Sequence, residues 1–250
     1  MMTLEHASLS DRGRIRQNNE DSCAIFVPEG PGELADRGAV FVVADGMGGH
    51  RGGEIASRIA VRTIIAFYTA NADENRSYAL SRAFREANKT IIEESVADST
   101  LFGMGTTCTA LALFRGRAYI AHVGDSRAYH LRGGRITQIT HDHSIVGEMV
   151  RSGILSDEDA RNHPKRNVIT KSLGAQDDVA ADMPAALEVE PGDTFLLCSD
   201  GLTTYLSDAD IGDVLSGSTP AEACKKMVKI ANEAGGRDNV TVLVVKVTSV

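Results

Sequence analysis

A short apolar strand that ends in a carboxylate and a group of glycines constrains this chain more than any other feature. The stretch 39–53 reads AVFVVADGMGGHRGG. Its apolar part, 40–44, is rich in β-branched residues and too short for a helix, so it predicts a buried strand. Asp45 follows directly, and the glycines after it allow positive φ angles and close approach of a ligand to the backbone. Alone, an Asp-Gly pair would indicate only a turn.

The same arrangement recurs, which makes an isolated turn a poor explanation. Residues 196–201 read LLCSDG, so a second aspartate stands at the end of an apolar strand and before a glycine. Two more acidic segments, RQNNED at 16–21 and GGRDN at 235–239, lie beside predicted strand ends. If these strands converge, their carboxylates would repel one another and their pKa values would rise unless a cation lay between them. The aspartates concerned are Asp21, Asp45, Asp200 and Asp238.

The available ligands favour a hard divalent cation. They are carboxylates and glycine carbonyls, with no Cys or His at the spacing of a zinc site, so we expect Mg²⁺ or Mn²⁺. Two such ions bridged by a carboxylate and a water would give a hydroxide nucleophile and a clamp for in-line displacement at phosphorus. Arg16 would then hold the phosphate, because a guanidinium offers two parallel donors to its oxygens.

Length and composition bound the class of protein. The chain has 250 residues, of which 42% are hydrophobic, so we expect a single domain over 1–250 with a large core. A formal net charge of -8 argues against nucleic acid or an anionic membrane as the main partner. No apolar run approaches the ~20 residues of a membrane span, and the N-terminus lacks a signal-peptide core, so we expect a cytoplasmic protein. The cysteines form no Cys-x-x-Cys pair and predict reduced thiols.

Periodicity predicts how the elements follow one another. Helices are expected over 55–67, 80–91 and from Thr219 to Gly235-Gly236, and a polar segment at 141–167 with two helical patterns, 145–151 and 156–161, indicates an inserted flap. Residues 28–38 are predicted to be a loop. Three or four strands between 106 and 139, with Gly133-Gly134 as a hairpin turn, predict an antiparallel meander. Strands are also expected at 7–10, 22–27, 194–198 and 240–247. Because strands and helices are grouped without strict alternation, the pattern indicates a layered α+β domain.

Six short motifs then follow one another along nearly the whole chain. They are Arg16 with Glu20-Asp21, Asp45-Gly46-Met47-Gly48-Gly49-His50, Gly103-x-Gly105-Thr106-Thr107, Gly124-Asp125-Ser126-Arg127, Ser199-Asp200-Gly201 and Arg237-Asp238-Asn239. Each motif is weak alone, whereas six in this order are specific. Together they resemble the motifs of the metal-dependent type-2C (PPM) serine/threonine protein phosphatases in their bacterial form.

The resemblance implies an α-β-β-α fold, in which two antiparallel sheets form a central sandwich between helical layers, with a small flap at about 141–175. It implies a hydrolase that uses Mn²⁺ or Mg²⁺ to remove phosphate from phosphoserine and phosphothreonine in proteins, opposing a bacterial Ser/Thr kinase. The expected partners are phosphorylated proteins, including a cognate kinase, and the expected state is a monomer without nucleic acid or a membrane span.

The resemblance also implies a role for each motif residue. Asp45 would bridge both core ions, and Gly46 would bind through its carbonyl. Asp200 and Asp238 would complete one ion, while Arg16 would bind the substrate phosphate. Asp21 and Glu20 would act at the site through waters, and Asn239 would hold the ligands in place without contacting the ions.

One departure from the family concerns the acid that protonates the leaving group. Animal members carry a His directly after the Asp-Gly, whereas this chain has Met47, as is usual in bacterial members, and a thioether cannot donate that proton. We therefore expect a metal-bound water to serve, with His50 as the less favoured choice. Five other histidines are interpreted as surface or core residues: His122, His130, His141, His143 and His163.

Asp125 lies in a Gly-Asp-Ser-Arg turn, where a capped turn and a functional role are equally compatible with the sequence. In bacterial members the equivalent aspartate and the Ser-Asp-Gly aspartate hold a third, weaker ion. The resemblance therefore implies that Asp125 and Asp200 share such an ion here.

Three other interpretations were open. A nucleotide-binding loop would need a glycine where Arg51 and Cys108 stand, so both glycine patterns fail. A catalytically weak metal-binding regulatory module on the same fold would be expected to have lost ligands, whereas every expected acid is present. A solely structural metal site would have no use for Arg16.

Overall fold

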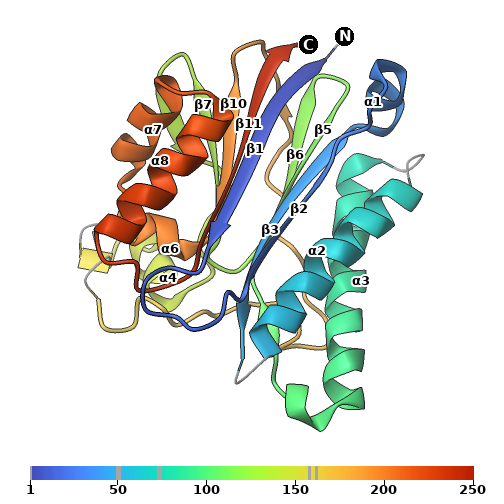
Figure 1. Cartoon of the computed structure of the whole chain (residues 1–250). Coiled ribbons are helices and arrows are strands. Elements are labelled where there is room, and N and C mark those ends of the chain that lie inside the picture. Colours follow the sequence, from blue (N-terminus) through green and yellow to red (C-terminus); the bar gives the residue numbers. More distant parts are fainter. Residues whose placement is uncertain (1, 49–51, 72–74, 157–158, 161–162) are drawn as a thin grey trace.

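A computed structural model describes residues 2–48, 52–71, 75–156, 159–160 and 163–250. Its layers run helix, sheet, sheet, helix (Figure 1). The long helices α2 (Gly52–Ala70) and α3 (Arg76–Ala97) cover the outer face of one sheet, and α7 (Asp208–Ser216) and α8 (Pro220–Glu233) cover the outer face of the other. The expected α-β-β-α fold class is therefore confirmed.

The two sheets are antiparallel throughout and each collects strands from both halves of the chain. One has the order β1-β11-β10-β7-β8, the other β2-β3-β5-β6-β9, and β4 pairs with β3. The bounds of the first sheet are β1 (Thr3–Asp11), β11 (Val240–Ser249), β10 (Thr194–Cys198), β7 (Arg127–Arg132) and β8 (Arg135–Gln138). Those of the second are β2 (Asp21–Phe26), β3 (Ala39–Met47), β4 (Gly105–Thr106), β5 (Cys108–Phe114), β6 (Arg117–Val123) and β9 (Leu187–Glu188).

The core between the sheets explains why β3 is apolar without alternation. Phe41 and Val43 point into the sandwich, where Phe195 of β10 and Leu243 of β11 meet them. Val42, on the opposite face of β3, packs under α2 and α3. A strand covered on both faces needs apolar residues at every position, which is what 40–44 supply.

The helices bury narrow faces rich in alanine. In α2 the fully buried positions Ala56, Ala60 and Ile64 are spaced four apart, which places them on one face of the helix. The apolar face that the sequence predicts for this helix consists of Ile55, Ile59, Ile64 and Phe67. Ile64 is fully buried as expected, whereas the other three are only partly buried at the edges of the face. Small side chains at the centre allow the helix to lie close to the sheet.

Helix α8 matches its predicted start in detail. The Thr219 hydroxyl accepts a hydrogen bond from the backbone N–H of Glu222, and the Thr219 N–H donates to the Glu222 carboxylate. The two form a capping box, with Pro220 in the first turn. The strand over 194–198 also lies where the sequence predicts it, as do the hairpin at Gly133-Gly134 and helix α4 (Ile145–Arg151). The second helical pattern of that segment, 156–161, includes residues outside those described.

The structure corrects two predictions. The expected loop at 28–38 contains helix α1 (Pro31–Arg37), which begins with proline in its first turn and ends at Gly38, whose φ is 73°. The expected meander over 106–139 is divided between the sheets, because the chain leaves β6 in one sheet and enters β7 in the other. The turn that makes this crossing carries Asp125. Short helices η1 (Ser99–Leu101) and α6 (Asp200–Thr203), and helix α7, were not predicted.

Among the described helices, none combines the length and the apolar character that crossing a membrane would require.

The inter-sheet core should dominate the stability of the fold. Phe41 is fully buried, so Phe41→Ala is expected to lower the free energy of unfolding by about 3–5 kcal/mol through lost burial and a residual cavity. Urea unfolding followed by circular dichroism measures this. The matched control is Phe102→Ala, because that side chain is 86% exposed and should change the stability by no more than about 0.5 kcal/mol. Equal losses in both variants would contradict this account of the core.

Candidate active site

Both sheets place acidic residues at the same end of the sandwich. Asp21 opens β2 and Asp45 lies near the end of β3, and the two are direct partners in the antiparallel register. From the other sheet, Asp200 follows β10 as the first residue of α6, and Asp238 precedes β11. Strand pairing thus brings together carboxylates that are far apart in the sequence, as the strand-end pattern predicts.

Asp21 is the most deeply placed of these carboxylates. Its Oδ2 accepts a hydrogen bond of 2.8 Å from the Ser199 hydroxyl, which in turn accepts one of 2.9 Å from the Thr241 backbone N–H. Its Oδ1 is buried and, among the described residues, has no hydrogen-bond partner. Burial is the main cause that raises the pKa of Asp21 to about 7, with the charges of Asp200 and Asp238 adding to it.

Asp45 and Asp200 form the centre of the group. Burial, followed by the charge of Asp21 and the other aspartates, raises the pKa of Asp45 well above its ordinary value. Burial and the charge of Asp238 raise the pKa of Asp200 to about 6, although a hydrogen bond with Asp45 partly offsets them. These carboxylates repel one another in an environment that shields them poorly, which leaves the site in need of positive charge.

Glycine at 46 lets the backbone beside Asp45 pack against two other segments. A Cβ at Gly46 would lie 2.0 Å from the carbonyl oxygen of Gly53 and 2.6 Å from that of Glu20, so no side chain fits. The Gly46 N–H donates to the Glu20 carbonyl at 3.1 Å. The Ser57 hydroxyl donates to the same carbonyl at 2.6 Å. The N-terminal part of α2 and the acidic end of β3 are thereby joined through the Glu20 carbonyl.

Asn239 ties the N-terminal loop to the site. Its Oδ1 accepts from the Glu20 N–H at 2.8 Å, and its Nδ2 donates to the carbonyls of Arg12 and Asn18, both at 2.9 Å. A single buried amide thus satisfies three backbone groups of the segment that carries Glu20 and Asp21. Burial is the main cause that raises the pKa of the Glu20 carboxyl.

Arg16 lies at the rim of the site. Its guanidinium donates to Asp238 Oδ2 at 2.8 Å, and this hydrogen bond is the main cause that raises the pKa of Arg16. The Arg16 side chain is 52% exposed. It lines a hollow of about 170 Å³ together with Gln17, Asn18, Glu20 and Asn239. A half-exposed cation therefore stands beside the buried acids.

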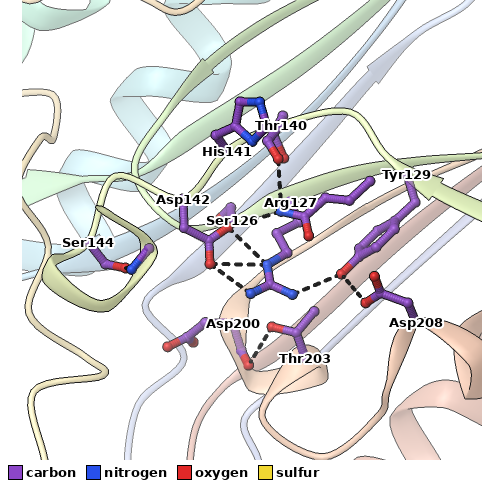
Figure 2. A network of polar contacts seen from close by, with 12 residues as sticks. Ser126, Arg127, Tyr129, Thr140, His141, Asp142, Ser144, Asp200, Thr203 and Asp208 are labelled. Carbon is purple, nitrogen blue, oxygen red and sulfur yellow. Dashed lines mark hydrogen bonds and ion pairs between the residues drawn. The ribbon is translucent and has the colours of Figure 1, made fainter. Parts of the chain in front are cut away.

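Asp125 approaches the group from the turn between the two sheets. Burial and then the charge of Asp200 raise its pKa well above the ordinary value, with Asp142 adding to them. The next residue but one, Arg127, donates to both oxygens of Asp142 at 2.7–3.1 Å and to the Tyr129 hydroxyl at 3.0 Å. Figure 2 shows this guanidinium held between the two groups, above Asp200 and α6.

These residues suit a hard cation by the chemistry of their donors. All are oxygen donors, the Asp21 Oδ1 lacks a partner among the described residues, and the carboxylates raise one another's pKa. Within the described ranges, no three His, Cys, Asp or Glu side chains already converge as the ligands of one ion. The structure thus shows mutually repelling carboxylates around a common region, not a closed coordination shell. Mg²⁺ and Mn²⁺ fit such a set better than Zn²⁺ does.

Some supporting residues could not be found from the sequence. Ser199 was identified only as part of a motif, yet it links Asp21 to β11. The Thr107 hydroxyl accepts from the Asp45 N–H at 3.0 Å and lies 2.7 Å from the Ser126 hydroxyl, which connects the end of β3, where Asp45 lies, to the turn that carries Asp125. Asp142, the partner of Arg127, carried no signal at all. His50 lies outside the described residues.

Comparisons with known proteins agree with this geometry. Residues 14–241 match the family described as Protein phosphatase 2C. The serine/threonine phosphatase Stp of Listeria innocua is 40% identical over 243 residues, covering 95% of this chain and 93% of that protein. A crystal structure of the Mycobacterium tuberculosis serine/threonine phosphatase PstP is 36% identical, with a TM-score of 0.87, and the match covers 98% of this chain and 99% of that one.

A further structure is the catalytic domain of PstP in complex with two manganese ions. It is 35% identical to this chain, with a TM-score of 0.87 and full coverage of both chains. The fold and its acidic end thus define a protein phosphatase, a hydrolase of phosphate esters. This chain belongs to the protein phosphatase 2C family. The family inferred from the six motifs is confirmed.

The close packing at Gly201 should couple stability to activity. A Cβ there would lie 1.9 Å from the backbone oxygen of Asn239, so Gly201→Ala must displace either Asp200 or Asn239. We expect it to lower the free energy of unfolding by about 1–3 kcal/mol and to reduce phosphatase activity in the fraction that remains folded. Thermal unfolding and steady-state kinetics measure the two effects.

The control is Gly32→Ala in α1, where an added Cβ would meet no atom of another described segment within 4 Å. That substitution should raise the free energy of unfolding slightly, by about 0.5–1 kcal/mol, and leave turnover unchanged. If Gly201→Ala were as stable and as active as Gly32→Ala, the packing described at Gly201 would be wrong.

Proposed function

We propose that this protein phosphatase hydrolyses phosphoserine and phosphothreonine in proteins, using two divalent cations, Mn²⁺ or Mg²⁺, at the acidic end of the sandwich. The observation that carries the proposal is the convergence of four aspartates from both sheets, where burial and the charges of Asp21, Asp200 and Asp238 raise the pKa values of neighbouring carboxyls. Bound cations would relieve that repulsion, activate a water for attack and neutralise charge on the phosphoryl group. The relatives named as serine/threonine phosphatases, and the one in complex with two manganese ions, support this assignment.

The ligands we propose follow from position in the fold. Asp45 lies between Asp21 on the neighbouring strand and Asp200 on the other sheet, which suits it to serve both ions. The carbonyl of Gly46 and the carboxylates of Asp200 and Asp238 would complete the set. Asp21 and Glu20 would act through waters. Asn239 would hold the loop that carries them, because its three hydrogen bonds fix that backbone.

Arg16 would bind the phosphate of the substrate. Within the described part of the chain, only one of its terminal nitrogens is engaged, with Asp238, so other donors of the guanidinium fork stay available. Its exposure leaves them within reach of a phosphopeptide. The ion pair with Asp238 also fixes the guanidinium next to the acids. The phosphate would thereby be held where the activated water can attack it in line.

A third, weaker ion is proposed between Asp125 and Asp200. The support is electrostatic, because the charge of Asp200 is the largest of the neighbouring charges that raise the pKa of Asp125. Met47 is only partly buried beside the site and its thioether has no proton to give. A water of this region is therefore our proposed source of the proton that the leaving alkoxide needs.

The remaining expectations concern organisation and partners. We propose one phosphatase domain over 1–250 with a flap at about 141–175, acting as a monomer on phosphorylated proteins that include a cognate kinase. A cytoplasmic setting fits the four free cysteines. The net charge of -8 fits a protein without nucleic acid as partner. A catalytically weak regulatory module is the alternative, and the presence of every proposed acid argues against it.

Metal removal tests the proposed mechanism directly. Activity towards a phosphopeptide should be abolished by excess EDTA and restored by added Mn²⁺ or Mg²⁺, because the acids form a working site only around a cation.

Substitution of the proposed bridging ligand is a second test. Asp45→Asn should lower kcat by orders of magnitude, since it removes a negative charge from the carboxylate that is proposed to serve both ions. Full turnover in excess chelator, or a near-normal rate for Asp45→Asn, would disprove the two-ion mechanism.

Arg16→Ala separates phosphate binding from catalysis. Since the guanidinium would hold phosphate in both the ground state and the transition state, KM for a phosphopeptide should rise at least as clearly as kcat falls. Steady-state kinetics across a range of peptide concentrations measures both. Arg85→Ala on the exposed face of α3 is the control and should match the wild type. An unchanged KM in Arg16→Ala would count against this role.

A further inference from the structure

The turn that carries Asp125 is bound to His143 by a pair of hydrogen bonds. The backbone N–H of His143 donates to the Gly124 carbonyl at 2.7 Å, and the Gly124 N–H donates to His143 Nδ1 at 3.0 Å. Both polar groups of the residue directly before Asp125 are therefore held by one histidine. That histidine is only 6% exposed.

Gly124 needs such support more than another residue would. Its φ is 108°, and a Cβ would lie 2.5 Å from the Cβ of Thr107, so only glycine fits. Glycine has the greatest conformational freedom of any residue, and it places a flexible joint next to Asp125. External hydrogen bonds are then what fixes the direction in which Asp125 leaves the backbone.

The hydrogen-bond pattern determines the tautomer of His143. A backbone N–H can only donate, so Nδ1 must be unprotonated and the ring proton must be on Nε2. Nε2 lies 3.1 Å from Asp182 Oδ2, and the other oxygen of Asp182 accepts from Lys171 Nζ at 2.7 Å. Although partial burial opposes it, hydrogen bonds from Lys171 and His143 lower the pKa of Asp182 to about 2. A charged carboxylate thus holds the proton on Nε2.

The ring of His143 is also held in its plane. It stacks on the ring of His122, with centroids 4.9 Å apart and an interplanar angle of 29°. The His143 carbonyl accepts from the Thr170 N–H at 2.8 Å. His143 belongs to the segment that enters the proposed flap, while Thr170 and Lys171 belong to the segment that leaves it. Both ends of the flap therefore meet at this histidine.

We propose that His143 is a positioning residue for the phosphatase reaction: as the Nε2–H tautomer, oriented by Asp182 and Lys171, it fixes the Gly124 peptide and so aims Asp125 at the acidic centre. This inference deepens the proposed function and rests on the role given there to Asp125. His143 touches no reacting group, and the residue was interpreted from sequence only as a surface or core histidine. The carboxylate, imidazole and backbone amide act in series, as supporting residues behind metal ligands commonly do.

Two substitutions separate the two nitrogens of the ring. In His143→Asn the amide oxygen replaces Nδ1 and can still accept from the Gly124 N–H, while the contact with Asp182 is lost. In His143→Gln the amide nitrogen replaces Nε2 and can still donate to Asp182, while the acceptor for Gly124 is lost. A residue that served only to fill space would not distinguish these variants. His141→Asn is the matched control, because the hydrogen bond that His141 makes to His122 uses its backbone carbonyl, which the substitution keeps.

The full chain is assayed with a phosphopeptide over a range of Mn²⁺ concentrations. His143→Gln should lower kcat/KM by about tenfold or more and raise the Mn²⁺ concentration that gives half-maximal rate. His143→Asn and His141→Asn should stay close to the wild type. Wild-type turnover in His143→Gln, or equal impairment in His143→Asn and His143→Gln, would overturn the proposal.

A measurement on the wild-type protein keeps the test independent of how the variants fold. Long-range ¹H–¹⁵N correlation spectra report which ring nitrogen of His143 carries the proton, and hydrogen exchange reports the protection of the Gly124 amide. An unprotonated Nδ1 with a protected Gly124 amide supports the proposal, whereas a protonated Nδ1 or a freely exchanging amide overturns it.

Asp125→Ala is measured in parallel to separate this inference from the proposed function. If Asp125→Ala turns over like the wild type, the role proposed for Asp125 fails. The tautomer of His143 and the protection of Gly124 would then still decide whether the histidine fixes the turn, because neither depends on activity.

Discussion

Repulsion between buried carboxylates is the constraint on which the rest of this structure depends. Burial and mutual charge raise the pKa of Asp21 to about 7 and that of Asp200 to about 6, and they raise the pKa of Asp45 well above its ordinary value. Such a group opposes folding unless a cation joins it, so the surrounding fold must hold it in place and supply the stability that the group lacks. The apolar sandwich does so, because its two sheets share a continuous core.

Hydrogen bonds with buried polar side chains fix the backbone of the site relative to this core. Buried polar side chains accept from backbone groups near the site: Ser199 from the Thr241 N–H in β11, Asn239 from the Glu20 N–H, and Thr107 from the Asp45 N–H in β3. These side chains are uncharged, so they add no further repulsion to the acidic centre. His143 plays the same part for the turn at Gly124, and a charged neighbour fixes its tautomer.

Crossing from one sheet to the other gives the site its last acid. If β5, β6, β7 and β8 formed one meander, the turn before β7 would lie at the edge of a single sheet. Because β6 and β7 belong to different sheets, the turn spans the end of the sandwich and Asp125 faces the group that Asp200 belongs to. The pair Arg127 and Asp142 then ties this crossing to the segment that follows β8 (Figure 2).

The sequence by itself determined the local elements and the identity of the acids. Residues next to one another in the sequence are enough to predict these features. They include the apolar strand that ends at Asp45-Gly46, the same pattern at Asp200-Gly201, and the helix cap at Thr219. Tertiary structure alone decided which sheet each strand joins, that Asp142 pairs with Arg127, and that His143 supports Gly124. Those contacts join side chains whose partners are selected by packing, and no periodicity along the chain records them.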